Sequence, residues 1–158
     1  MNTFATIQHL AQSETAYWQI GQTPLLDLAA TVAAAGLPTS IKLLAKAEWF
    51  NPSGSVKDRA ALQIIQTAEA SGQLWPGMTL LDSSSGNMAL AYAHLGRLRG
   101  YKIRLVVPAN ATPARLALLQ NYGIDLTLSD PALGSDGAMA VAQAVAAKNP
   151  HFFYANQY

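Results

Sequence analysis

The sequence contains no cysteine and few charged residues. Without cysteine among its 158 residues, the chain can form neither disulfides nor thiolate metal sites. Charged side chains make up only 12% of the chain, the formal net charge is +1 and no basic stripe is visible, so no nucleic-acid partner is expected. The three histidines, His9, His94 and His151, lack the spacing of metal ligands. We therefore expect no metal site.

Long hydrophobic runs and targeting segments are also missing. The most apolar stretch, residues 25–37, is interrupted by Asp27 and is too short to span a membrane. No basic segment followed by an apolar one occurs near residue 1. The glycine patterns of Rossmann and P-loop sites are absent as well. These absences predict a cytoplasmic protein without a membrane partner, long enough for one domain with a sizeable core.

From residue 41 onward, segments of strand and helix character alternate. The helix expected at residues 113–122 carries its own end signals: Thr112 as N-cap, Pro113 at the first position and Gly123 just beyond the end. Helices placed between strands at this spacing predict right-handed βαβ units, a parallel sheet and the α/β class. We expect strands at residues 41–47, 79–82, 102–107, 124–128 and 151–154, and helices at residues 56–74, 87–99, 113–122 and 135–148.

The first 40 residues do not follow this alternation. We expect a helix near residues 4–12 and a short strand at residues 23–28, and this strand has no obvious partner in the alternating region. The chain is therefore divided into residues 1–40, residues 41–150 as an α/β domain, and a final segment of residues 151–158.

The most informative string, residues 51–59, places a lysine at the start of an expected helix. Ser55 is suited to be the N-cap, and Asp58 completes an arrangement like a capping box. Lys57 would then be the second helical residue, where the positive end of the helix dipole disfavours an ammonium ion. A neutral lysine amine is a nucleophile that can form a Schiff base. The alternative interpretation is an exposed lysine in an ordinary first turn.

A second loop, residues 82–88, follows an expected strand and opens an expected buried helix. Its three serine hydroxyls, its backbone N–H groups and the helix dipole form a cradle for an anion such as a carboxylate. The Asn87 side chain could also reach a hydroxyl or phenolate on a ring. The alternative interpretation is a serine-rich turn with Asn87 as the helix cap.

Other polar residues have simpler interpretations. His94 lies within an apolar helix and is expected to be packed or surface-facing, and no Ser, His and Asp order indicates a hydrolase. A small basic cluster is expected to form a solvated edge between helix and strand; its members are Arg97, Arg99, Lys102 and Arg104.

The lysine string closely resembles the lysine motif of the β-family (fold type II) pyridoxal-phosphate enzymes, specifically cysteine synthases. The string Ser84-Ser85-Gly86-Asn87 is similar to their substrate-carboxylate loop, and residues 21–28 are similar to their N-terminal strand. The likeness covers residues 15–158 in the right order, and it implies the N-terminal half of such an enzyme. Further matching segments are residues 100–108, 130–137 and 153–158.

The resemblance implies roles for particular residues. Lys57 would hold pyridoxal 5′-phosphate as an internal aldimine and move the α-proton. Asn87 would form a hydrogen bond with the pyridoxal 3′-oxygen. The substrate carboxylate would be held by Gln157 and by Ser84 and Ser85 of residues 84–87, which we call the serine loop. The implied reaction is β-replacement: an activated serine, such as O-acetylserine or O-phosphoserine, forms an aminoacrylate to which a sulfur nucleophile adds. The substrate-binding set is Ser84, Ser85, Gly86, Met88 and Gln157.

Two departures from the family pattern matter. Met88 stands where the family usually has threonine, which removes a hydroxyl from the carboxylate subsite and adds bulk. The chain also ends at Tyr158, before the glycine-rich phosphate-binding loop and the large domain that residues 1–40 would join; residues 151–158 would start the crossover to that absent half. We expect the isolated chain to retain the cofactor weakly or not at all and to lack β-replacement activity.

Three hypotheses remain open. The chain is one subunit of a split enzyme whose other half is a second chain, or it is a truncated and inactive domain. In the third hypothesis it is a binding or regulatory module that docks through an apolar face. The 51% content of hydrophobic residues suits either alanine-rich helices or a surface reserved for another chain. Cysteine synthases are typically homodimers, so a homo-oligomer is also an expected assembly.

Overall fold

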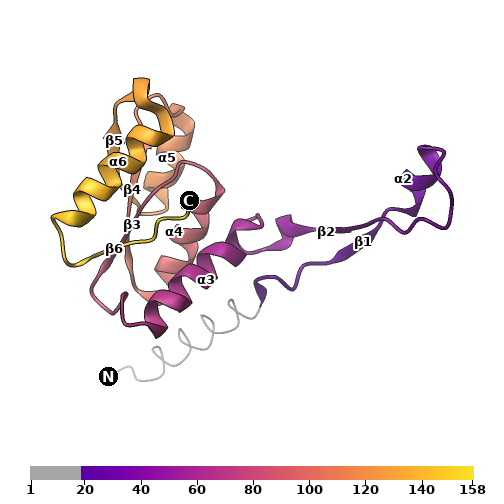
Figure 1. Cartoon of the computed structure of the whole chain (residues 1–158), viewed down its shortest axis with the longest axis horizontal. Coiled ribbons are helices and arrows are strands. Elements are labelled where there is room, and N and C mark those ends of the chain that lie inside the picture. Colours follow the sequence, from indigo (N-terminus) through magenta and orange to yellow (C-terminus); the bar gives the residue numbers. More distant parts are fainter. Residues whose placement is uncertain (1–18) are drawn as a thin grey trace. The chain divides into compact units, whose positions relative to one another are not determined.

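The computed structural model describes residues 19–158 and divides the chain into two compact units. The first unit ends at Val56 and the second runs from Lys57 to Tyr158 (Figure 1). The helix expected near residues 4–12 lies outside the described residues. Within residues 19–158, no helix combines the length and the apolar character that crossing a membrane requires.

The first unit contains a two-stranded antiparallel ribbon. β1 (Leu25–Asp27) pairs with β2 (Leu44–Lys46), with Leu26 opposite Ala45. The short helix α2 (Ala29–Ala34) lies in the connection, and a 3₁₀ turn, η1 (Glu48–Phe50), follows β2.

This pairing corrects one prediction. We expected a strand at residues 41–47 within the parallel sheet and no partner for residues 23–28, but the two segments pair with each other. Strands of a parallel sheet are covered on both faces and are almost continuously apolar. Residues 41–47 include Lys42 and Lys46, and Leu44 is 52% exposed, which suits a two-stranded ribbon instead.

Asn51, the first residue of the lysine string, holds the first unit together. It is 3% exposed, and its amide donates to Glu48 Oε2 at 2.7 Å and accepts from the Gly21 backbone N–H at 2.8 Å. Glu48 Oε1 in turn accepts from the Thr23 hydroxyl at 2.9 Å. Asn51 therefore has a structural role in joining the approach to β1 with the turn after β2.

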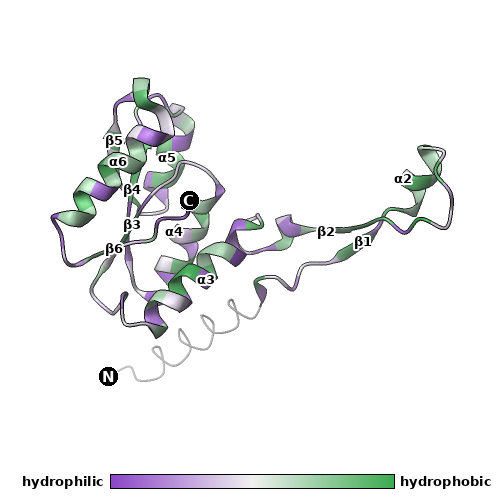
Figure 2. Cartoon of the chain, viewed as in Figure 1, coloured by the Kyte–Doolittle hydropathy of each residue, from purple (hydrophilic) through white to green (hydrophobic). Residues whose placement is uncertain are grey.

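Hydrophobic residues occur along β1, α2 and β2 of the first unit (Figure 2). Several of the apolar side chains of this unit are exposed. Leu25 is 57% exposed and Leu37 is 47% exposed. That residues 1–40 pack on a further domain stays a prediction.

The second unit confirms the predicted α/β class. Its four strands are all parallel and lie in the order β5-β4-β3-β6. The strands are β3 (Thr79–Ser83), β4 (Lys102–Pro108), β5 (Asp125–Ser129) and β6 (Phe152–Tyr154). The helices are α3 (Lys57–Ala70), α4 (Asn87–Arg99), α5 (Pro113–Asn121) and α6 (Gly134–Ala147), with a 3₁₀ turn, η2 (Pro131–Leu133), before α6.

Helices cover both faces of this sheet. α6 lies on one face, and α4 and α5 lie on the other (Figure 1). Leu81 and Val106 are fully buried under α6, where they pack against Ala138 and Ala142. As predicted, α4 is buried, and its alanines permit close approach to its neighbours, including α3.

The ends of α5 were predicted well from local sequence signals, and the ends of α3 were predicted less well. Thr112 caps α5 by accepting a hydrogen bond from the Arg115 backbone N–H at 3.3 Å, and Pro113 is its first residue. α3 begins at Lys57, one position later than expected, and ends at Ala70 instead of residue 74. The chain turns at Gly72, whose φ of 71° is left-handed, which lets the buried Leu74 follow outside the helix.

Candidate functional site

The loop after β3 joins that strand to the buried helix α4. Ser84 accepts a hydrogen bond at its hydroxyl from the Gly86 backbone N–H at 3.4 Å. Gly86 is the N-cap of α4 in an extended conformation, and Asn87 is the first helical residue. The alternative in which Asn87 caps the helix is therefore wrong. Its exposed side chain makes no hydrogen bond within residues 19–158, which leaves the amide available to a ligand.

A pocket of about 210 Å³ opens at the carboxyl ends of the parallel strands. In open α/β sheets this edge is the usual place for ligands, because loops and helix N-termini converge there. Lys57, the first residue of α3, lines the pocket together with residues of the serine loop. The structure brings all the predicted site residues to this one pocket: Lys57, Ser84, Ser85, Gly86, Asn87, Met88 and Gln157. Their individual roles stay predictions.

Further residues line the same pocket and were not assigned to it from the sequence. Ser135 lies in the first turn of α6, within the segment 130–137 whose likeness to cysteine synthases was visible but carried no role. Tyr158 and Pro108 border the opening, and Val106 and Ala138 belong to its apolar floor. Met88 is 5% exposed, so its thioether side chain occupies space beside the serine loop.

The final segment of the chain is tied to β3. The Ala155 backbone N–H donates to the Leu81 carbonyl at 2.9 Å, which continues the direction of β6 beyond its last residue. The Gln157 side-chain amide donates to the Ser83 carbonyl at 2.9 Å, a contact between residues 74 apart. Gln157 therefore ties the end of the chain to Ser83, the residue just before the serine loop. Its binding of a substrate carboxylate stays a prediction.

Asp82 and Tyr92 form a buried polar pair directly beneath the serine loop. Both residues are fully buried, and the Tyr92 hydroxyl donates to Asp82 Oδ2 at 2.9 Å. The other carboxylate oxygen, Oδ1, accepts from the Ser83 backbone N–H at 2.8 Å. A carboxylate in an apolar interior is costly unless such donors surround it. Sequence reasoning missed this pair, although an aspartate at the end of an apolar strand was a signal for it.

Burial raises the pKa values of both residues of this pair. It raises the pKa of the Asp82 carboxyl above its ordinary value of 3.8, against the opposing hydrogen bonds of the Ser83 backbone, the Tyr92 hydroxyl and the Gln157 backbone. Burial also raises the pKa of the Tyr92 phenol, and the nearby Asp82 charge adds to that effect.

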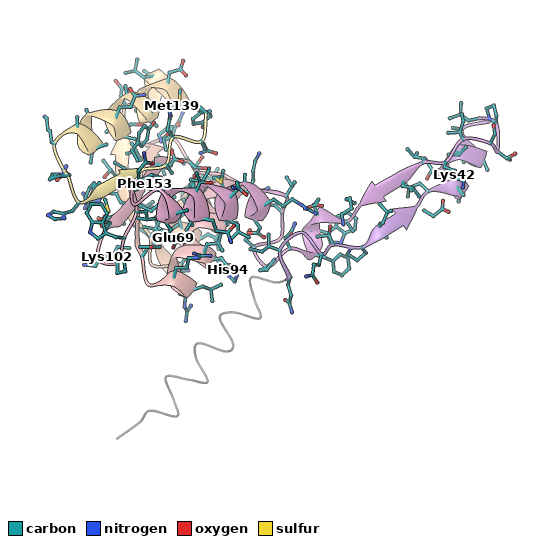
Figure 3. The ribbon with its side chains drawn as sticks, turned by 60° about the horizontal axis from the view of Figure 1, so that its bottom comes forward. Lys42, Glu69, His94, Lys102, Met139 and Phe153 are labelled. Carbon is teal, nitrogen blue, oxygen red and sulfur yellow. The ribbon has the colours of Figure 1, made fainter. Side chains whose placement is uncertain are left out.

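The described residues contain no cluster of histidine and carboxylate side chains that could hold a metal ion. His94 lies on α4 (Figure 3), and its Nε2 atom is buried without a hydrogen-bond partner among residues 19–158. Burial lowers the pKa of His94, and Asp58 acts in the opposite direction. A neutral, packed imidazole agrees with the interpretation from the sequence.

Comparisons with known proteins place this α/β site in a family. The sequence profile of the pyridoxal-phosphate dependent enzymes matches residues 18–158, so the chain belongs to that family. Within the family it is cysteine synthase-like. Cysteine synthase 3 of Caenorhabditis elegans is 41% identical over 140 residues, which are 88% of this chain and 40% of that protein. Cysteine synthase B of Pseudomonas aeruginosa is 42% identical over 125 residues, which are 78% of this chain and 40% of that protein.

A solved structure supports the same assignment. The O-acetyl serine sulfhydrylase isoform 3 from Entamoeba histolytica superposes with a TM-score of 0.82 at 34% identity. The match covers 90% of this chain and 43% of that protein. The chain thus spans well under half the length of the relatives that it matches.

The buried pair leads to a prediction for stability. Tyr92→Phe should lower the free energy of unfolding at neutral pH by about 1–3 kcal/mol, because ionised Asp82 loses a buried donor. Because the folded-state pKa of Asp82 is raised, its contribution to stability is full below the unfolded pKa and is lost as pH rises through the folded pKa. The variant should therefore differ less from the wild type in acid, where Asp82 is protonated, as denaturant titrations across pH can measure.

Tyr122→Phe is the matched control. The Tyr122 side chain is 47% exposed and its hydroxyl makes no hydrogen bond within residues 19–158, so this change should alter stability by less than about 0.5 kcal/mol. Equal effects of the two substitutions, or a pH-independent loss in Tyr92→Phe, would contradict the assignment of a charged and hydrogen-bonded Asp82.

Proposed function

We propose that this chain supplies the lysine side of a cysteine synthase-like site that binds pyridoxal 5′-phosphate and performs β-replacement on an activated serine. O-acetylserine and O-phosphoserine are the substrates of the expected class, and a second chain provides the other half of the enzyme. The observation that supports the proposal is the single pocket that both Lys57 and the serine-rich N-terminus of α4 line.

The residues present fit such a cofactor. The Lys57 amine can condense with an aldehyde, and the Asn87 amide has hydrogen-bonding capacity for a ring oxygen. The Ser84 and Ser85 hydroxyls and the first N–H groups of α4 suit a substrate carboxylate. Pyridoxal phosphate, when bound, supplies an electron sink for the electrons left at Cα by loss of a proton.

The chain's own residues would perform the proton transfers. The Lys57 amine takes the α-proton of the substrate, and the leaving group departs from the β-carbon with its bonding electrons. A sulfur nucleophile then forms a bond to that carbon, and Lys57 returns the proton to Cα. Met88 and Val106, both buried, provide an apolar wall that keeps water from this part of the pocket.

One observation supports a second chain. Apolar side chains such as Leu25 and Leu44 are more than half exposed, which favours a surface that another polypeptide covers. The same exposure favours the alternative function, a catalytically inactive module that docks on a partner.

Reductive trapping tests the proposed lysine. The chain is incubated with pyridoxal 5′-phosphate and then with borohydride, which fixes even a weakly populated imine, and the modified lysine is identified by peptide mass spectrometry. We expect Lys57 to be modified preferentially over Lys148, an exposed lysine just after α6, because the pocket residues orient the cofactor. Modification of the two lysines to the same extent would refute the site.

Matched variants make this test specific. Asn87→Ala should reduce trapping at Lys57 and leave Lys148 unchanged, whereas Asn121→Ala, the same change at an exposed residue that does not line the pocket, should alter neither. The inactive-module alternative predicts no preference for Lys57 in any variant.

Copurification tests the second chain. Capture of the protein from its native source, followed by mass spectrometry, should recover a partner that carries a glycine-rich phosphate-binding loop. Lys57→Ala should capture the same partner, because the lysine lies in the pocket and not on the exposed apolar residues of the first unit. Recovery of the chain alone would contradict this part of the proposal.

A further inference from the structure

The pocket at the carboxyl ends of the strands, which we call the lysine pocket, is bordered by the N-termini of two helices. α4 and α6 lie on opposite faces of the parallel sheet, and both begin at this edge (Figure 1). Asn87 and Met88, at the start of α4, line the pocket, and so does Ser135 at the start of α6. The proposed function uses only the α4 end, for a carboxylate. The α6 end is left without a role.

The N-terminus of α6 lacks a side-chain cap. Leu133 occupies the N-cap position and provides no side-chain hydrogen bond. Asp130, the nearest preceding carboxylate, caps η2 instead, by accepting from the Ala132 backbone N–H at 2.9 Å. The first N–H groups of a helix have no intrahelical partner, and in this helix of 14 residues they carry the positive end of the dipole. This end of α6 therefore suits an acceptor that enters from the pocket.

Ser83, the last residue of β3, contributes an unpartnered hydroxyl to the same side of the pocket. The residue is 2% exposed, and its Oγ atom has no hydrogen-bond partner within residues 19–158. Alternate residues of a strand point to the same face, so Ser83 lies on the α6 face together with Leu81. A buried hydroxyl without a partner is unfavourable, and rotation about its single χ1 bond can turn it toward a group bound in the pocket.

A continuous series of neighbours connects Ser83 with Ser135. Ser83 is the register partner of Val106 in the pairing of β3 with β4. Val106 packs against Ala138, which lies one helical turn after Ser135 on the same side of α6. All four residues line the lysine pocket. The two hydroxyls and the N-terminus of α6 therefore border the same side of the pocket.

The chemistry of this side suits an anion. It offers two hydroxyl donors and a helix N-terminus, and no carboxylate side chain of residues 19–158 lines the pocket. An activated serine has a carboxylate for the α4 end and a leaving group on its β-carbon. When the bond from the β-carbon to its oxygen breaks, the electron pair stays on the departing oxygen, which leaves as an acetate or phosphate anion. Donors placed beside that oxygen stabilise the charge that develops on it.

We propose that Ser83, Ser135 and the N-terminus of α6 form a leaving-group subsite, which binds the oxyanion that departs from the activated serine. The role as a leaving-group subsite rests on the proposed function, whereas binding of the anion needs neither the cofactor nor a second chain. Asp136 is exposed in the first turn of α6 and does not line the pocket. Its negative charge weakens the site without occupying it.

NMR titration of the chain with sodium acetate and with inorganic phosphate, at constant ionic strength, tests the subsite. Both anions should shift the backbone amides of Ser135, Asp136 and Gly137, and the anion that binds more tightly identifies the ester that the subsite suits. Ser135→Ala should weaken anion binding at α6 about tenfold, as expected for loss of a hydrogen bond to a charged group. It should leave the shifts of the serine loop unchanged, because α4 is a separate helix end.

Ser83→Ala separates binding from structure. It should weaken anion binding at α6 severalfold without lowering the free energy of unfolding, because the hydroxyl has no partner in the free protein. Asp136→Asn should strengthen binding, because it removes a negative charge beside the anion. Ser71→Ala is the matched control: Ser71 is exposed just after α3 and does not line the pocket, so the affinity should not change.

Three results would each overturn the subsite: no shift of the α6 amides at tens of millimolar anion, shifts confined to the serine loop, or undiminished affinity in both Ser135→Ala and Ser83→Ala. The titration contains no cofactor, so its outcome is independent of trapping at Lys57. If trapping fails while the anion binds at α6, the proposed function fails and the anion site stands.

Discussion

The buried carboxylate of Asp82 is the constraint on which the candidate active site depends. It lies at the end of β3 with no exposed surface, and such a group is tolerated only when donors surround it. Those donors come from three places: the Ser83 backbone, Tyr92 on α4 and the backbone of Gln157. The hydrogen bonds to the Asp82 carboxylate therefore hold the end of β3, helix α4 and the last residues of the chain in fixed positions relative to one another.

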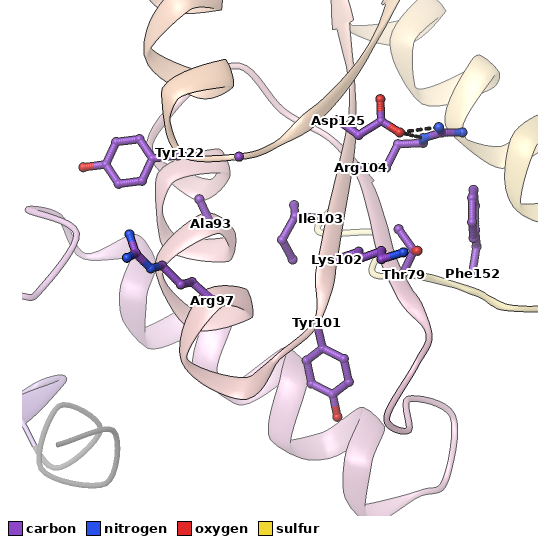
Figure 4. Close-up of a pocket in the computed structure, with 11 residues that line it drawn as sticks. Thr79, Ala93, Arg97, Tyr101, Lys102, Ile103, Arg104, Tyr122, Asp125 and Phe152 are labelled. Atoms are coloured by element: carbon purple, nitrogen blue, oxygen red, sulfur yellow. Dashed lines mark hydrogen bonds and ion pairs between the residues drawn. The ribbon is translucent and has the colours of Figure 1, made fainter. Parts of the chain in front are cut away.

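The parallel sheet gives its two edges different chemistry. At the carboxyl edge, α4 begins behind a serine loop and Lys57 begins α3, so hydroxyls, N–H groups and an amine converge. At the amino edge the strands begin with Thr79, Lys102, Asp125 and Phe152, and Arg104 pairs with Asp125 there (Figure 4). The pairing of β3 with β4 thus places the lysine pocket at one end of the two strands and these residues at the other.

Local signals in the sequence predicted the local features of the fold, such as where a helix begins and whether it is buried. Thr112 and Pro113 fixed the start of α5, and the apolar pattern of residues 87–99 identified a buried helix. That Lys57 and the serine loop lie in one pocket was predicted from the family resemblance and not from their spacing in the sequence. Long-range contacts carried no local signal: the pairing of residues 25–27 with residues 44–46, the Gln157 bond to Ser83 and the Tyr92 bond to Asp82 depend on which segments the fold brings together.

Lys57 and the serine loop border one pocket, and we propose that they hold one ligand. Amide hydrogen exchange, measured by NMR before and after reductive attachment of pyridoxal phosphate to Lys57, is the sharpest test of this shared site. We expect slower exchange for the amides of Ser85, Gly86 and Asn87, with no change in the strand amides of β5. Unchanged exchange in the serine loop after full modification of Lys57 would show that the two do not share a ligand.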